Sequence, residues 1–208
     1  MTEENTVAGL VGVAGLVVVT LWSGAFAAAE SPGDPERGRV VFSGKQCIRC
    51  HVPQAEKGVG PALEELRRPQ GAFQLAGRLW NHAPAMFALL QKERVEWPEI
   101  AAVEMADLMA YLGADPSRDA APDLLQGQAA LVRKGCLKCH SLKGEGARIG
   151  PELSERRALY DSASVWAARM WTHSPRMAAK AAEHGLLLPR FAGEELGNLI
   201  SFLRSATR

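Results

Sequence analysis

The sequence predicts an all-α protein of two tandem helical domains, each a few short helices, preceded by an N-terminal hydrophobic helix. Three observations support this fold class. Motifs recur in the same order in both halves of the 208-residue chain. Each half ends in an amphipathic pattern of helical period, and a long apolar run lies near the N-terminus. We expect four segments: a hydrophobic helix at 1–30, a first domain at 31–114, a linker at 115–122 and a second domain at 123–208.

The first predicted element is the apolar run from Val7 to Ala29, interrupted only by two hydroxyl residues and glycines. It is long enough to cross a bilayer as a helix, which needs ~20 residues. Residues 1–5 contain no Lys or Arg, which fits neither an anchor nor a secretory signal well, whereas the alanine-rich residues 25–29 resemble a signal-peptidase site. The sequence favours a transmembrane anchor over a cleaved signal. In both cases we expect the rest of the chain to be exported.

An internal repeat organises the remainder of the chain. Four blocks of the first half recur in the second in the same order, with the offset growing only from 89 to 91 residues, which chance does not produce. The matched blocks are Cys47–His51 with Cys136–His140, Gly60-Pro61 with Gly150-Pro151, Trp80, His82, Pro84 and Met86 with Trp171, His173, Pro175 and Met177, and Tyr111-Leu112 with Phe202-Leu203.

Each half is expected to contain the same helices. A short helix precedes the cysteines, at Pro35–Ser43 and at Asp123–Arg133. A glycine-rich loop follows the histidine, and a middle helix runs to the tryptophan, where Pro84 or Pro175 is expected to end it or to start a new helix. The last helix of each half is amphipathic. Its apolar positions are Ile100, Val103, Met105, Leu108 and Leu112 in the first half and Leu196, Leu199, Ile200 and Leu203 in the second.

Two further expectations concern packing. Met105, Met109 and Met170 have no counterpart in the other half, so we interpret them as core residues. The linker is short, polar and contains two prolines, which leaves the two domains little freedom to move apart. We therefore expect the domains to pack against each other.

The duplicated Cys-x-x-Cys-His motif carries the chemistry. In this motif two thioethers fix the vinyl groups of haem c, and the adjacent histidine becomes the proximal iron ligand. A zinc site would need its cysteine pairs ~12–20 residues apart, whereas 85 residues separate Cys50 from Cys136 here. A thioredoxin-like redox pair would need a βαβ pattern, which the sequence lacks. The motif predicts two covalent haems, with His51 and His140 as iron ligands.

With these motifs, each half resembles a class I cytochrome c domain, and residues 35–206 together resemble a tandem di-haem cytochrome c. The resemblance rests on the haem motif, the Gly-Pro pair after it, and terminal helices with an aromatic residue near Tyr111 or Phe202. It implies that the carbonyls of Pro61 and Pro151 accept a hydrogen bond from the haem histidines, which would fix the ring orientation.

The sixth iron ligand departs from the family pattern. The family usually places a Met-Pro pair shortly before the last helix, but this chain has Trp97-Pro98 and Leu188-Pro189, and neither Trp nor Leu binds iron. The duplicated His-x-Pro-x-Met segments are the alternative. From the frequency of His/Met ligation we favour Met86 and Met177, with His82 and His173 as competing ligands that would give lower potentials. Trp80 and Trp171 are expected either to pack against haem edges or to be ordinary core aromatics.

The resemblance implies an electron carrier rather than an enzyme. The expected partners are a membrane electron donor and a downstream acceptor, on the periplasmic side of a bacterial membrane. A rival interpretation is a cytochrome subunit of a larger dehydrogenase or haem-copper oxidase complex. A di-haem peroxidase is a third, but it would need one haem without a sixth protein ligand, and both halves offer one.

Charge bears on the partners as well. The net charge of +1 gives no reason to expect nucleic-acid binding. Residues 31–115 contain 10 Lys and Arg against 11 Asp and Glu, and residues 116–208 contain 14 against 9. The basic second domain either docks an acidic redox partner or reflects ordinary surface variation.

Overall fold

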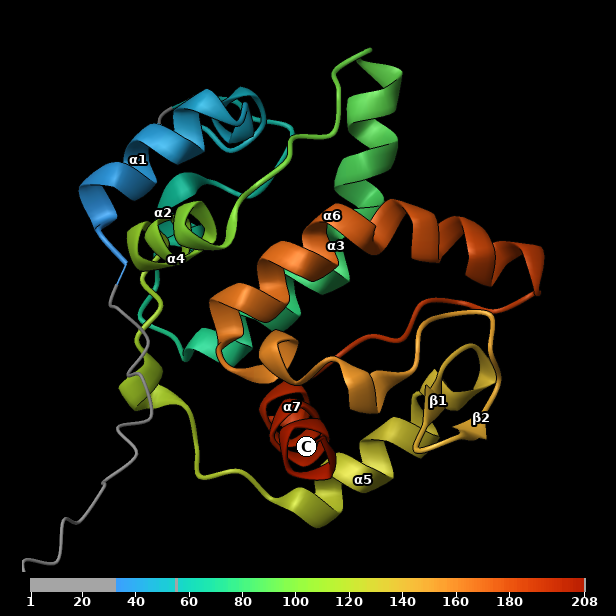
Figure 1. Ribbon diagram of the computed structural model, residues 1–208. Helices are drawn as coiled ribbons and strands as arrows, with labels where there is room; N and C mark the ends of the chain where they lie inside the picture. Colours follow the sequence, from blue (N-terminus) through green and yellow to red (C-terminus); the bar gives the residue numbers. More distant parts are fainter. Residues whose placement is uncertain (1–32, 55, 208) are drawn as a thin grey trace, which may run out of the picture. The chain divides into compact units, whose positions relative to one another are not determined.

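A computed structural model describes residues 33–54 and 56–207, in which helices and short helical turns predominate (Figure 1). Within these ranges no helix has the length and apolar character to cross a membrane. The predicted hydrophobic helix at 1–30 lies outside the described residues. The α-helices of the described part are α1 Pro35–Gly44, α2 Leu63–Leu66, α3 Ala72–Lys92, α4 Ala102–Tyr111, α5 Leu124–Arg133, α6 Ala163–Glu183 and α7 Glu195–Ala206, and the strands β1 Ser141–Leu142 and β2 Glu145–Gly146 form an antiparallel hairpin.

The first helix of each repeat begins where the sequence predicts. Asp34 and Asp123 are the N-cap residues of α1 and α5, and each carboxylate accepts hydrogen bonds from two backbone N–H groups of the first turn. These bonds satisfy donors that have no partner within the helix. The predicted ranges of both helices are therefore confirmed to within one residue.

The middle helices differ from the prediction. Both α3 and α6 continue for 21 residues, through Pro84 and Pro175, so the expectation that these prolines end or restart the helix was wrong. A proline within a helix removes one backbone hydrogen bond and kinks the helix. The turns on either side keep their hydrogen bonds, so the helix can continue. Both ribbons change direction part-way along their length (Figure 1).

Two glycines set the closest helix crossings. α1 packs against α4 in the first repeat, and α5 packs against α7 in the second. A Cβ atom on Gly38 would lie 2.0 Å from the carbonyl oxygen of Asp107, and one on Gly127 would lie 2.1 Å from that of Asn198. Only glycine permits this approach. The backbones of the first and last helices of each repeat are therefore in direct contact at this glycine.

The last helices bury the apolar face that their sequences predict. Every predicted position is buried except Val103, which is 66% exposed, so its assignment to the apolar face was wrong. Val103 lies on the opposite side of α4 from Met105, Leu108 and Met109, because successive residues are separated by about 100° around a helix. Met105 and Met109 are core residues as expected, and Met170 packs against the core partly buried.

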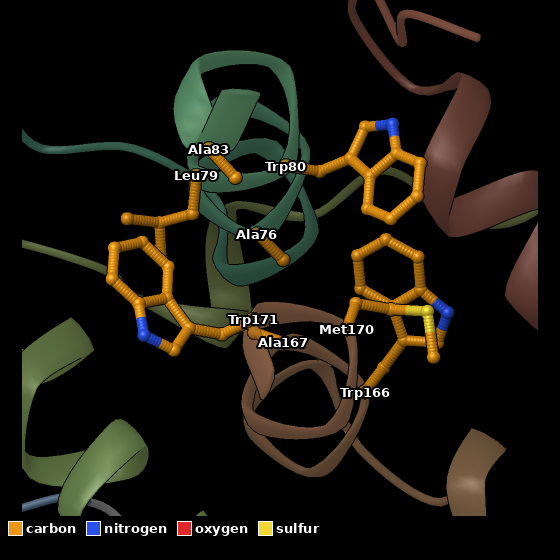
Figure 2. A pocket seen from close by; sticks show the side chains of 8 residues that line it. All are labelled: Ala76, Leu79, Trp80, Ala83, Trp166, Ala167, Met170 and Trp171. Atoms are coloured by element: carbon orange, nitrogen blue, oxygen red, sulfur yellow. The ribbon is translucent and has the colours of Figure 1, made fainter. Parts of the chain in front are cut away.

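The two repeats pack against each other through α3 and α6, as expected. Ala76 and Ala167, at matching positions of the two helices, are 0% and 4% exposed. The helices leave a cavity of about 10 Å³, lined by four side chains from each (Figure 2). The chain from Ser31 to Arg208 forms one compact unit by its contacts, and its division at the linker into two domains stays a prediction from the sequence.

Candidate functional site

Each Cys-x-x-Cys-His motif is wound into a single tight turn, at Cys47–Arg49 and Cys136–Lys138. The turn starts after a residue in the left-handed conformation, Gln46 with φ 68° and Gly135 with φ 71°. The histidine closes it, because the backbone N–H of His51 donates to Cys47 O at 3.0 Å and that of His140 to Cys136 O at 2.9 Å. The two thiols and the imidazole of a motif thus come from one turn of chain.

The four cysteines are free and partly buried. Burial raises the pKa of Cys47 to about 11, and burial likewise raises the pKa of Cys136 to about 11. Redox-active cysteine pairs have a thiol whose pKa is lowered, so these two thiols lack that property. Among the described residues no group of three His, Cys, Asp or Glu side chains is arranged to hold a metal ion.

The haem-motif histidines are held by the prolines that the family resemblance implies. His51 Nδ1 lies 3.0 Å from the carbonyl oxygen of Pro61, and His140 Nδ1 lies 2.9 Å from that of Pro151. A carbonyl only accepts, so Nδ1 carries the hydrogen and donates it. In the neutral ring Nε2 then keeps its lone pair, which is the form that binds metals. The expected hydrogen bonds are present in both repeats, and iron ligation by these rings stays a prediction.

The glycine before each proline has a role that the sequence did not reveal. A Cβ atom on Gly60 would lie 2.5 Å from Cε1 of His51, and one on Gly150 would lie 2.5 Å from Cε1 of His140. Real Cβ atoms do not approach another heavy atom so closely. The two residues of the Gly-Pro pair therefore act together: the glycine leaves space for the imidazole ring, and the proline carbonyl accepts the hydrogen bond from its N–H.

The candidate sixth ligands lie on the kinked middle helices, with His82 and Met86 on α3 and His173 and Met177 on α6. His82 Nδ1 donates to its own helix at Arg78 O over 2.8 Å, and His173 Nδ1 donates to Arg169 O over 2.9 Å. These rings, too, keep Nε2 free. The two methionines are partly buried and pack against the core, whereas His82 is exposed.

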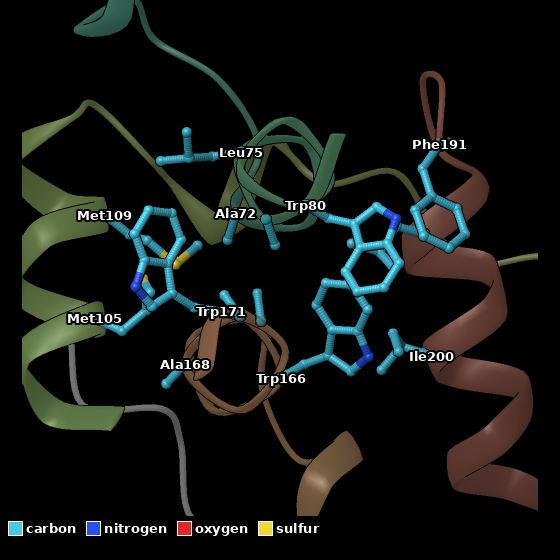
Figure 3. Close-up of a cluster of buried hydrophobic side chains, with 14 of the residues drawn as sticks. Ala72, Leu75, Trp80, Met105, Met109, Trp166, Ala168, Trp171, Phe191 and Ile200 are labelled. Carbon is cyan, nitrogen blue, oxygen red and sulfur yellow. The ribbon is translucent and has the colours of Figure 1, made fainter. Parts of the chain in front are cut away.

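The paired tryptophans lie in the core shared by the repeats. Trp80 is 8% exposed and Trp171 is 7% exposed. Trp80 extends from α3 toward Phe191 and Trp166, and Trp171 extends from α6 toward Met105 and Met109 on α4 (Figure 3). Each indole thus contacts aromatic side chains of the other repeat. Contact of either ring with a haem edge stays a prediction.

A lysine clamp holds the start of the last helix in each repeat, and the sequence analysis missed it. Lys45 Nζ donates to Glu99 O at 2.7 Å and pairs with Glu104 at 3.0 Å. Lys134 Nζ donates to Arg190 O at 2.6 Å and pairs with Glu195 at 2.6 Å. These residues recur at the repeat offsets of 89 and 91, so extending the internal alignment would have found them.

The loop after the second haem motif is fixed by a carboxylate. Glu152 accepts the N–H groups of Lys143 and Gly144, in the turn between β1 and β2, at 2.8 and 3.2 Å. Burial alone would raise the pKa of Glu152, but hydrogen bonds from Ser141, Ser154 and Gly144 lower it to about 2. An open cavity of about 540 Å³ lies at this loop. The equivalent position of the first repeat is Ala62, so only the second loop has this carboxylate.

The two repeats share four features of the candidate site: the tight Cys-x-x-Cys-His turn, the His-Pro hydrogen bond, the glycine beside the ring and the His-x-Pro-x-Met helix. Comparison with models of protein families and with curated proteins gives no match for this chain.

Proposed function

We propose that this protein is an electron carrier with two covalently bound haems c, one in each repeat. The observation that carries the proposal is the His-Pro hydrogen bond behind each Cys-x-x-Cys-His motif, at 3.0 Å for His51 and 2.9 Å for His140. A loop turn alone does not explain why the same ring nitrogen meets a proline carbonyl twice. A metal-binding histidine almost always donates its other N–H in this way.

The residues at both motifs have the chemistry that haem c requires. Free thiols at Cys47 and Cys50 in the first repeat, and at Cys136 and Cys139 in the second, would form the thioethers. When bound, haem c supplies an iron centre that accepts and releases single electrons. The proline carbonyls orient each imidazole and make it more basic, and the glycines beside the rings leave space for that orientation.

We propose Met86 and Met177 as the residues that would supply the sixth iron ligand, and His82 and His173 are the competing pair. The partial burial of both methionines supports this choice, since thioether ligands suit an apolar site and raise the potential. With a protein ligand on each side in both repeats, neither iron would have a position for substrate. This favours electron transfer over peroxidase chemistry.

The packing of α3 against α6 supports a relay within one molecule. It would hold the two haems at a fixed separation, so that an electron enters at one repeat and leaves at the other. We propose that the donor is a membrane-bound redox protein and that the acceptor is a second redox protein on the periplasmic side. The apolar run at 7–29 would anchor the chain to the membrane.

The test is the intact mass of the protein purified from its native host, compared with two double variants. The wild-type mass should include two haems, and Cys47→Ala/Cys50→Ala and Cys136→Ala/Cys139→Ala should each lose one. The two variants serve as controls for each other. A mass without haem contradicts the proposal. The same mass reports whether residues 1–29 are retained, as an anchor requires, or removed, as in a soluble carrier.

A further inference from the structure

Two tryptophans make reciprocal hydrogen bonds between the repeats. Trp80 on α3 donates its indole N–H to Pro189 O of the second repeat at 2.6 Å. Trp171 on α6 donates its indole N–H to Pro98 O of the first repeat at 2.8 Å. Both indoles are buried, where a carbonyl that loses its donor pays the cost of desolvation. These bonds therefore fix where each proline lies.

The two prolines belong to loops that precede the last helix of each repeat, loop 95–101 before α4 and loop 186–192 before α7. Each loop is held further by the opposite repeat. Phe191 N donates to Asn81 Oδ1 at 2.9 Å, and Asn81 Nδ2 donates to Phe191 O at 2.6 Å. Loop 186–192 is thus held by two consecutive residues of α3.

Loop 95–101 is held by stacking as well. Trp97 lies over Trp171 with ring centroids 4.1 Å apart and an interplanar angle of 21°, and it donates its indole N–H to Trp171 O at 3.0 Å. That carbonyl is the one that Pro175, four residues later, leaves without a helical donor. The kink in α6 therefore supplies the acceptor for a residue of the first repeat.

The same contacts reach the candidate ligand segments. Trp97 makes an edge contact at 5.6 Å with Phe87, which follows Met86 on α3. Trp171 precedes His173 by two residues on α6. A continuous aromatic chain of Phe87, Trp97 and Trp171 therefore joins the ligand segment of one repeat to that of the other.

We propose that Trp80 and Trp171 are positioning residues that act across the repeat boundary: Trp171 fixes loop 95–101 and the ligand segment beside it, and Trp80 fixes loop 186–192. The iron environment in the first repeat then depends on a tryptophan of the second. The effect on the iron rests on the proposed function, whereas the positioning of the loops does not.

Hydrogen exchange of the full-length protein, followed by mass spectrometry, tests the positioning. Trp171→Phe should speed exchange in loop 95–101 roughly two- to tenfold, as expected for loss of one buried hydrogen bond, and leave loop 186–192 unchanged. Trp80→Phe should speed exchange in loop 186–192 and leave loop 95–101 unchanged. Trp166→Phe is the matched control, because its ring packs against Trp80 and Phe191 but it makes neither of the two proline bonds.

If Trp171→Phe does not fold, Trp97→Phe tests the same inter-repeat contact from the loop side, since it keeps an aromatic ring on Trp171 and removes only the N–H to Trp171 O. It should speed exchange in loop 95–101 by a similar factor. Equal effects of Trp166→Phe and Trp171→Phe on loop 95–101 would overturn the proposal. Unchanged exchange of that loop in Trp97→Phe, or faster exchange in Trp80→Phe and Trp171→Phe confined to the repeat that contains the substituted residue, would overturn it as well.

The effect on the iron is measured in a protein that retains one haem. In Cys136→Ala/Cys139→Ala only the first-repeat haem remains, and adding Trp171→Phe should shift its midpoint potential and its visible spectrum, although Trp171 belongs to the second repeat. An unchanged potential would overturn the coupling. A protein without haem would instead overturn the proposed function, and the exchange result would still stand.

Discussion

At the scale of single residues, the imidazole of His51 is confined on two sides. Pro61 O accepts its Nδ1–H at 3.0 Å, and Gly60 leaves the space that Cε1 occupies. The ring of His140 is confined in the same way by Pro151 and Gly150. Because the acceptor is a backbone carbonyl, changing the proline side chain would leave it in place. The glycine is therefore the residue at which this arrangement is most sensitive to substitution.

We predict that Gly60→Ala or Gly150→Ala lowers haem incorporation in its own repeat. The new Cβ would lie 2.5 Å from the imidazole, so the ring or the loop must move and the His-Pro bond must lengthen or break. The measurement is the fraction of purified protein with one and with two haems, by intact mass. Gly44→Ala is the control, because a Cβ there meets nothing within 4 Å. Full incorporation in both glycine variants would contradict the prediction.

A second prediction at this scale concerns the sixth ligand. Met86→Ala should remove methionine ligation at the first haem and lower its potential, and Met177→Ala should do so at the second. His82→Ala and His173→Ala are the matched comparisons, since each histidine lies one helical turn before its methionine. Optical spectra and redox titration distinguish the two sets. Unchanged spectra in both methionine variants, with altered spectra in the histidine variants, would assign His82 and His173 instead.

The sequence was most informative about those residues whose chemistry is local. Pro61 lies 10 residues after His51 and Pro151 lies 11 residues after His140, and the expected His-Pro bonds are present. The surroundings of Trp80 and Trp171 could not be predicted in this way. Their partners, Pro189 and Pro98, are 109 and 73 residues away in the chain, and no periodic pattern specifies a distant backbone carbonyl.

At the scale of elements, the junction of α1 with α4 has an ion pair at Asp107, whereas the equivalent position of the α5–α7 junction is the uncharged Asn198. The side chain of Asp107 is 6% exposed, and it accepts hydrogen bonds from Arg37 and from the backbone N–H of Asp34. The hydrogen bond from Arg37 lowers the pKa of Asp107. In the second repeat Asn198 accepts the N–H of Asp123 at 2.8 Å in the same place. The two junctions should therefore respond differently to acid.

We predict that acid destabilises the wild-type protein more than it destabilises Asp107→Asn. An unfolded Asp carboxyl has a pKa of about 3.9, and the folded value is lower, so the ionised carboxylate stabilises the fold above the unfolded pKa. That contribution is lost as the pH falls through the folded pKa. Urea unfolding at pH 7 and at pH 3 measures it.

The reciprocal variant is the control for that prediction. Asn198→Asp places a carboxylate at the position equivalent to Asp107, but the residue equivalent to Arg37 is Gln126, which has no charge to pair with it. The variant should therefore be less stable than the wild type at pH 7, and this difference should shrink as acid protonates the new carboxylate. Equal acid sensitivity of the wild type and Asp107→Asn would show that this ion pair adds nothing to stability.

The middle helices show how far a local rule extends. Proline was expected to end or restart the helix, yet α3 and α6 each continue well beyond it. The proline itself removes only one backbone hydrogen bond. Whether the helix continues past it depends on tertiary contacts. In α6 the freed Trp171 O accepts hydrogen bonds from Trp97 and from Ser174. These partners compensate for the bond that proline removes.

At the scale of the whole molecule, the buried apolar residues of the two repeats form one shared core. Trp80 packs with Trp166 and Phe191 of the second repeat, at centroid distances of 5.9 and 6.3 Å. Trp171 stacks on Trp97 of the first. Removing one repeat would expose these rings and leave cavities in the other. We therefore expect the described part of the chain to unfold as one cooperative unit despite its internal repeat.

Leu199→Ala tests this cooperativity. Leu199 is a core residue of α7 with 4% exposure, so truncation should cost about 2–5 kcal/mol. In a single cooperative unit, the slowest-exchanging amides of α1 and α4 in the first repeat should lose as much protection as those of α7. Val103→Ala, at a 66% exposed position, is the control. Loss of protection confined to the second repeat would contradict the prediction.

The reciprocal hydrogen bonds of Trp80 and Trp171 between the repeats have a consequence for self-association. Trp80 meets Pro189 and Trp171 meets Pro98, and these are matching positions, so the interface is isologous, as in a homodimer with two-fold symmetry. One repeat, produced as a separate chain, would carry both sides of this contact and could pair with a second copy of itself. The linker makes the pairing intramolecular and hence independent of protein concentration.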